Sequence, residues 1–223
     1  MHFLPPHLQS YFNKTTEKTI EVNCMSEFVK LFSPSYVVTV LGPSRVQEKV
    51  LGFDDILSGL PPGQTFALQF KKPSLRADGY PRFILNVSQL QVLLSRFNPR
   101  EAFFVLSPFT ITRDFITAHQ SGTLLHQCAL VDVYGIPFPT KQNQGTRTIK
   151  YLNQAQIEVT DPRRYHPVER TWSFDELAGS VMEGEVGRKR PVEKKEIKKE
   201  EKKRYGGRNY YVHVAYRREA TRE

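Results

Sequence analysis

Five consecutive apolar residues at positions 102–106, with the sequence AFFVL, constrain the fold of this chain more than any other feature. A strand with one face in water alternates apolar and polar residues, whereas a strand that is apolar at every position is typical of a sheet covered on both faces. Segments with helical spacing occur before and after it. We therefore predict an α/β fold with a central mixed sheet flanked by helices.

The remaining periodicity predicts an alternation of helices and strands that excludes helical bundles and pure β-sandwiches. Thr15 or Thr16, Ser44 and Ser88 are the expected N-caps, the last two with a Gln three residues later. Helices are expected over residues 17–32, from 44 to about 51, and over 88–97, 111–119 and 173–181. Strands are expected over residues 36–41, 53–57, 65–71, 83–87, 102–106 and 127–134, and within 149–160.

Composition narrows the class of protein. The chain has 223 residues, of which 39% are hydrophobic, and this is enough to build a core. No apolar run approaches the 18 residues of a membrane span, and the N-terminus lacks the pattern of a secretory signal. Cys24 and Cys128 are the two cysteines, far apart in sequence. This usage suits a reducing compartment, so we expect a cytoplasmic protein without membrane contact, with a homo-oligomer left open.

The net charge of +9 is concentrated at one end of the chain. Residues 188–208 carry eleven Lys or Arg and four Glu, whereas residues 1–187 have a net charge of only about +1. We therefore divide the chain into an α/β domain (1–187), a basic Lys/Glu-rich linker or exposed helix (188–208) and a C-terminal strand or tail (209–223). A basic segment can bind phosphates by counterion release, although a solvated spacer has the same composition. The candidate nucleic-acid contacts are Lys71, Lys72, Arg188, Lys189, Arg190, Lys194 and Lys195.

The segment 47–73 carries the most specific candidate site. Glu48 lies on the expected short helix, Asp54 follows that helix, and Gln69 and Lys71 lie two apart, on one face of the next strand. Oxygen ligands on adjacent strands suit a hard cation such as Mg²⁺, which neutralises charge and acidifies a bound water during phosphodiester hydrolysis. A nearby lysine can stabilise the developing charge.

This arrangement resembles the PD-(D/E)XK superfamily of restriction-endonuclease-like nucleases over residues 44–108. The matching residues are Glu48, Asp54 in GFD, QFK at 69–71, and Gln89 at the start of the following helix. The resemblance implies a restriction-endonuclease-like sheet and a DNA-cleaving hydrolase dependent on Mg²⁺ or Mn²⁺. Asp54, Glu48 and Gln69 would hold the metal, Lys71 would act on water or phosphate, and Gln89 would lie nearby.

The family pattern has Asp or Glu at the position of Gln69, and the chain resembles its Gln-x-Lys variant. Because a neutral amide is a weaker magnesium ligand than a carboxylate, the resemblance implies an active nuclease or a catalytically weakened relative. Alternatively, Gln69 and Lys71 form the solvent face of an amphipathic strand, and Asp54 only turns the chain. In that case the chain is a non-enzymatic binding module of viral, mobile-element or defence origin. Asp132, His119 and His126 are weaker candidates.

Overall fold

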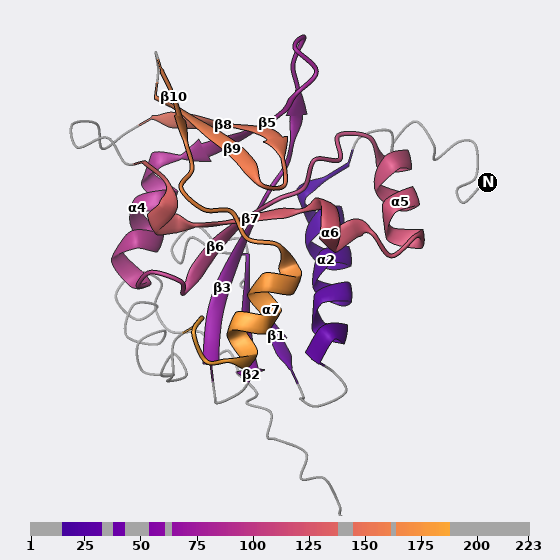
Figure 1. Ribbon diagram of the computed structural model, residues 1–223, viewed down its shortest axis with the longest axis vertical. Coiled ribbons are helices and arrows are strands. Elements are labelled where there is room, and N and C mark those ends of the chain that lie inside the picture. Colours follow the sequence, from indigo (N-terminus) through magenta and orange to yellow (C-terminus); the bar gives the residue numbers. More distant parts are fainter. Residues whose placement is uncertain are drawn as a thin grey trace, which may run out of the picture.

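The computed structural model describes residues 15–32, 38–42, 54–60, 64–137, 145–161 and 164–187. In this part the chain forms an α/β arrangement with a mixed sheet, an antiparallel sheet and helices packed around them (Figure 1). The predicted helix at Ser44, residue Glu48, and the basic extension from Arg188 onward lie outside the described residues. No helix of the described part is long and apolar enough to cross a membrane.

The mixed sheet has the strand order β1-β2-β3-β6-β7. Its strands are β1 (Thr39–Leu41), β2 (Asp55–Leu60), β3 (Gln64–Lys71), β6 (Ala102–Leu106) and β7 (Ala129–Asp132). Strands β3 and β6 are parallel, and the other neighbouring pairs are antiparallel. Helix α4 (Val87–Arg96) lies in the connection between the two parallel strands, as a parallel pair requires a crossover.

A second sheet is fully antiparallel, with the order β10-β9-β8-β5-β4. Its strands are β4 (Ser74–Leu75), β5 (Pro81–Asn86), β8 (Thr146–Asn153), β9 (Gln156–Asp161) and β10 (Arg164–Pro167). The prediction of one central sheet is therefore wrong for these segments. The physical reason is visible in β5, where Phe83 and Leu85 are buried while Ile84 and Asn86 are exposed. Such alternation belongs to a sheet with one covered face.

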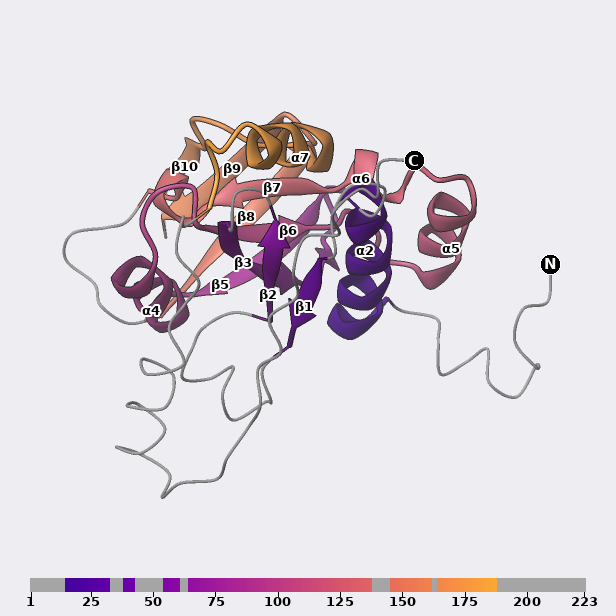
Figure 2. The ribbon, with the colours of Figure 1, turned by 90° about the horizontal axis from the view of Figure 1, so that it is seen from below.

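Two apolar clusters occupy the two faces of the mixed sheet. In β6, Phe103 and Val105 join one cluster, while Phe104 and Leu106 join the other. The first face is covered by α2 (Glu17–Phe32), α5 (Thr112–Gln120), α6 (Leu124–Gln127) and α7 (Phe174–Met182). Helix α4 and the apolar face of the second sheet cover the other (Figure 2). The prediction that β6 is covered on both faces is confirmed.

Side chains cap the first turns of α2, α4 and α7. Ser173 caps α7 in a capping box with Glu176, and Thr16 Oγ1 accepts the Thr19 N–H in the first turn of α2. The expected cap of α4 at Ser88 is wrong: Asn86 Oδ1 accepts the Ser88 N–H at 2.8 Å, so Asn86 is the cap. An Asn side chain two residues upstream offers the same acceptor without interrupting the helix.

The strand predicted over residues 127–134 is shorter in the structure. Strand β7 ends at Asp132, whose carboxylate accepts the Tyr134 N–H, and a 3₁₀ turn over Val133–Gly135 follows. Gly187 lies near this end of β7, because its N–H donates to the Arg100 carbonyl and the Arg100 N–H donates to Asp132. It packs against the first residues of β3. A Cβ on Gly187 would lie 3.1 Å from the Thr65 carbonyl oxygen, and its φ of +93° is one that glycine adopts without strain.

Candidate functional site

The candidate site lies where β2 begins and β3 ends. Asp54 directly precedes β2, and its N–H donates to the Leu68 carbonyl at 3.0 Å, which fixes it beside β3. Its Oδ2 atom accepts from Gln69 Nε2 at 2.6 Å and from the Phe70 N–H at 2.7 Å. The acid and the amide predicted from the sequence are therefore in direct contact.

Gln89, in the first turn of α4, extends this contact to Lys71. Its Nε2 donates to Gln69 Oε1 at 2.7 Å, and its Oε1 accepts from Lys71 Nζ at 2.8 Å. Asp54, Gln69, Gln89 and Lys71 thus form a continuous series of hydrogen bonds, which we call the site network. The strand end, the neighbouring strand start and the helix start all meet at this point.

Three of the four residues of the site network are buried, and Gln89 is half-buried. Asp54, Gln69 and Lys71 expose 7%, 1% and 9% of their surface, so the alternative that Gln69 and Lys71 form a solvent face is wrong. The reason is that this face of β3 lies under α4 and the second sheet, beside Phe104, whose ring centre is 5.9 Å from Lys71 Nζ. Polar groups are costly to bury unless they are hydrogen-bonded, and each of these three is.

A second group of charged residues lies beside Asp54. Asp55 begins β2 and is buried, and its Oδ2 atom has no hydrogen-bond partner. Burial raises the pKa of Asp55 to about 7; the negative charge of Glu21 also raises it, and Lys18 lowers it. Lys18 forms an ion pair with Glu21, one turn further along α2. Gly42 leaves room for Asp55, because a Cβ at that position would lie 3.3 Å from Oδ1.

The first turn of α2 also reaches the end of β3. Glu17 Oε2 accepts the backbone N–H of Lys72 at 2.9 Å. Sequence reasoning missed Glu17, Glu21 and Asp55. Two signals were available in the sequence. Asp55 directly follows Asp54, and Glu17 and Glu21 are four residues apart, so they share one face of a helix. The first two turns of α2 therefore add two carboxylates, those of Glu17 and Glu21, at the edge of the sheet where the site network ends.

The structure brings together four of the predicted site residues: Asp54, Gln69, Lys71 and Gln89. Lys72 lies next to them with an exposed side chain. Glu48 and the basic residues from Arg188 to Lys195 lie outside the described part. Asp132 belongs elsewhere, because its carboxylate accepts the backbone N–H groups of Arg100 and Tyr134 and so shapes a turn.

The described residues offer a divalent cation one clear carboxylate, that of Asp54. They contain no group of three His, Cys, Asp or Glu side chains placed to hold a metal. Magnesium is commonly bound by one or two carboxylates together with waters and substrate phosphates, so Asp54 fits a site of this kind. Gln69 turns its amide nitrogen toward Asp54, and its oxygen would face a shared cation only after a half-turn of the amide.

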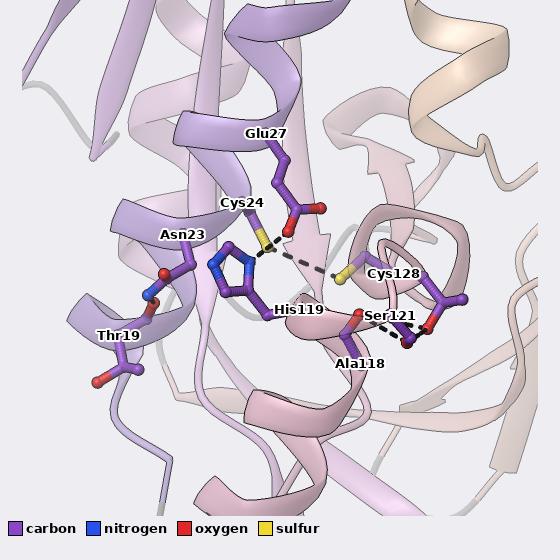
Figure 3. Close-up of polar contacts among 9 residues, drawn as sticks. Thr19, Asn23, Cys24, Glu27, Ala118, His119, Ser121 and Cys128 are labelled. Carbon is purple, nitrogen blue, oxygen red and sulfur yellow. Dashed lines mark hydrogen bonds and ion pairs between the residues drawn. The ribbon is translucent and has the colours of Figure 1, made fainter. Parts of the chain in front are cut away.

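The two histidines considered above connect helices. His119 contacts Glu27 of α2, as Figure 3 shows, and His126 Nδ1 lies 2.9 Å from Asp175 Oδ2 of α7. Both histidines line a pocket of about 420 Å³. Figure 3 also shows Cys24 and Cys128, whose sulfur atoms are 3.9 Å apart. These contacts join α2 to α5 and to the segment before β7, away from the site network.

Comparison with known proteins gives no assignment. No family model matches the chain. No curated protein matches it, and no solved structure matches it.

Proposed function

We propose that this protein hydrolyses phosphodiester bonds in DNA as a nuclease dependent on Mg²⁺ or Mn²⁺. The observation that carries the proposal is the site network: an acid, an amide and a lysine, from two adjacent strands, meet a glutamine from the following helix. Buried titratable residues gathered at one point are a common property of active sites. Their order along the chain agrees with the resemblance to PD-(D/E)XK nucleases.

The arrangement of elements also supports the proposal. Strands β1, β2 and β3 form an antiparallel series, the β4–β5 hairpin and α4 follow, and β6 then pairs parallel to β3. Apart from the β4–β5 hairpin, which belongs to the second sheet, this agrees with the β-β-β-α-β order of the family that the chain resembles. It places the ends of β3 and β6 at the same edge of the sheet, because parallel strands end together.

Each residue of the network has a distinct part in the proposed reaction. Asp54 supplies a carboxylate for the cation, which would neutralise phosphate charge and acidify an attacking water. Lys71 supplies a positive charge for the phosphate in the transition state. Gln89 holds the Lys71 ammonium in place at 2.8 Å, and Gln69 links this pair to Asp54. Because Gln89 acts through Lys71, we regard it as a positioning residue.

Cleavage of supercoiled and linear DNA by the full chain, with Mg²⁺, Mn²⁺ or EDTA, tests the proposal. We expect cleavage with a divalent cation, none with EDTA, and none for Asp54→Asn, which keeps the size of the side chain. Asp114→Asn is the matched control, because Asp114 is an exposed acid in the first turn of α5. Cleavage by folded Asp54→Asn at the wild-type rate would contradict the proposal.

The alternative is a protein that binds nucleic acid without cleaving it. The observation that favours it is Gln69: an amide nitrogen, instead of a second carboxylate, faces Asp54. The same preparation separates the two functions. If wild type and Asp54→Asn bind DNA equally and neither cleaves it with any cation, the protein is a binding protein.

A further inference from the structure

We propose that the hairpin formed by β4 and β5, together with Lys150 of β8, is the surface that docks double-stranded DNA beside the site network. This inference rests on the proposed function and names the part of the molecule that holds the substrate. The hairpin starts at Ser74, three residues after Lys71, so it grows directly out of the strand that carries the site. Figure 1 shows the segment between β3 and β5 projecting beyond the two sheets.

Positive charge within residues 1–187 is concentrated at the end of β3, where Lys71 belongs to the site network, and in the hairpin that follows. Residues 71–82 contain four basic residues and one acidic residue, a net charge of +3. The remaining residues up to position 187 have a net charge of −2. Lys72 and Arg76 have exposed side chains, and Lys150 lies opposite Arg82 on the neighbouring strand. A local cluster of positive charge, in a domain that is otherwise slightly acidic, directs a polyanion to one place.

Ion pairs hold the hairpin in one shape. Asp78 pairs with Arg82 at 2.5 Å and lies 3.8 Å from Lys150, which ties the turn to β8. The Gly79 N–H donates to the Arg76 carbonyl at 3.0 Å and closes the turn. Lys150 Nζ lies 4.3 Å from the centre of the Tyr80 ring. Because the hairpin is ordered before binding, docking costs less conformational entropy.

Two exposed apolar side chains accompany the charges. Leu75 exposes 57% of its surface and Tyr80 exposes 40%, on either side of the turn. A two-stranded ribbon fits the major groove of a duplex, where apolar groups contact thymine methyls, while the basic residues around it meet the backbone phosphates. A peptide partner would explain the apolar residues but not the concentration of positive charge, so we assign the surface to duplex DNA.

The test is binding of the full chain to a labelled duplex in EDTA, over a series of salt concentrations. The variant is Lys72→Ala with Arg76→Ala. The matched control is Lys30→Ala with Arg113→Ala, two exposed cations on α2 and α5. For the hairpin variant we expect weaker binding and a slope of log affinity against log salt that falls by about 2, roughly one for each phosphate that is no longer neutralised. The control should keep the wild-type slope.

A second variant tests the role of the exposed aromatic ring. Tyr80→Ala should weaken binding without changing the salt slope, because it removes an apolar contact and no charge, and Tyr80→Phe should restore most of the affinity. Wild-type affinity and slope in the hairpin variants would overturn the inference. So would tighter binding to a single strand of the same sequence, or hairpin-dependent binding of a peptide but not of DNA.

Failure of this inference and failure of the nuclease proposal give different results, because binding is measured without a cation. Hairpin-dependent DNA binding without cleavage under any condition would keep the docking surface and reject the nuclease. Cleavage that depends on Asp54, combined with unchanged DNA binding by both hairpin variants, would keep the nuclease and reject the docking surface.

Discussion

Gln69 donates its amide N–H to the Asp54 carboxylate across 2.6 Å. Gln69 stands at the position where the PD-(D/E)XK pattern has a second acid. The hydrogen bond satisfies a buried carboxylate with a neutral donor. It thereby replaces the repulsion between two carboxylates that a cation would otherwise have to relieve. Because Asp54 is satisfied by an amide donor in the absence of a cation, replacing Gln69 with an acid leads to the first prediction.

Gln69→Glu should lower the melting temperature relative to wild type in EDTA, and Mn²⁺ should restore it. Two buried carboxylates would then face each other, and a divalent cation would bind between them, so the melting temperature should fall without metal and recover with it. Thermal melts with and without Mn²⁺ measure this. Gln91→Glu, on the same helix as Gln89, is the control and should show no recovery. Equal melting temperatures of Gln69→Glu in both conditions would argue against a cation at this position.

Lys71→Met should separate chemistry from binding. The methionine fills a similar volume but removes the charge proposed to stabilise the transition state. We expect the cleavage rate at saturating DNA to fall on the order of 10²–10³-fold. Affinity for DNA should change far less, because Lys71 is buried and exposes only 9% of its surface. Single-turnover kinetics and anisotropy measure the two quantities, with Lys30→Met as control. A large loss of affinity with an unchanged rate would contradict the assigned role.

Asp55→Asn should stabilise the protein at neutral and alkaline pH. Burial raises the pKa of Asp55 to about 7 in the folded state, above its ordinary value of 3.8. The folded state therefore favours the protonated acid, and the stability that this provides is complete below pH 3.8 and lost as the pH rises through 7. Since one pKa unit corresponds to about 1.4 kcal/mol, the loss is at most about 4 kcal/mol.

Urea unfolding of wild type and Asp55→Asn at pH 5 and pH 8 measures this effect. The free energy of unfolding of the variant, relative to wild type, should be higher at pH 8 than at pH 5. Asp114→Asn, an exposed acid, gives the baseline. The same difference at both pH values would show that Asp55 ionises normally in the folded protein.

Cys24 and Cys128 should be unreactive in the folded protein. The hydrogen bond to Cys128, followed by burial, raises the pKa of the Cys24 thiol, and both side chains are fully buried. Because the thiolate is the reactive form, a thiol reagent should label neither residue under native conditions and both in denaturant. Labelling followed by mass spectrometry gives the count. Rapid modification of folded protein would show that α2 opens away from β7.

Deletion of residues 188–223 should weaken non-specific DNA binding. Most of the net positive charge lies in this segment, so its removal should lower the slope of log affinity against log salt by about 4–7. Circular dichroism of the truncated chain shows whether the fold survives. An unchanged slope in a folded truncation would mean that the extension is a spacer and that the hairpin binds the phosphates.

The sequence predicts the features that depend on neighbouring residues. Complete apolarity identifies β6 as a strand covered on both faces, and the two-residue spacing of Gln69 and Lys71 places them on one face of β3. This face meets Asp54 because β2 pairs with β3, and it meets Gln89 because α4 packs beside β3. The second sheet depends on pairing between β5 and β8, which are about 60 residues apart, so local periodicity does not reveal it. Asp55 and Glu21 also come together only through packing of α2 on the sheet.

The close packing of Gly187 on the first residues of β3 also bears on the spacing of the two segments proposed to bind DNA. Gly187 lies beside Thr65, and Lys71 lies at the other end of the same strand. At about 3.3 Å per residue these ends are roughly 20 Å apart, which corresponds to about six base pairs of a duplex. Gly187, after which the basic extension begins, and the end of β3, from which the hairpin begins, are therefore separate points on the protein. If the basic extension and the hairpin both bind DNA, we expect a duplex much shorter than one helical turn to contact only one of these two segments at a time, and a longer duplex to contact both.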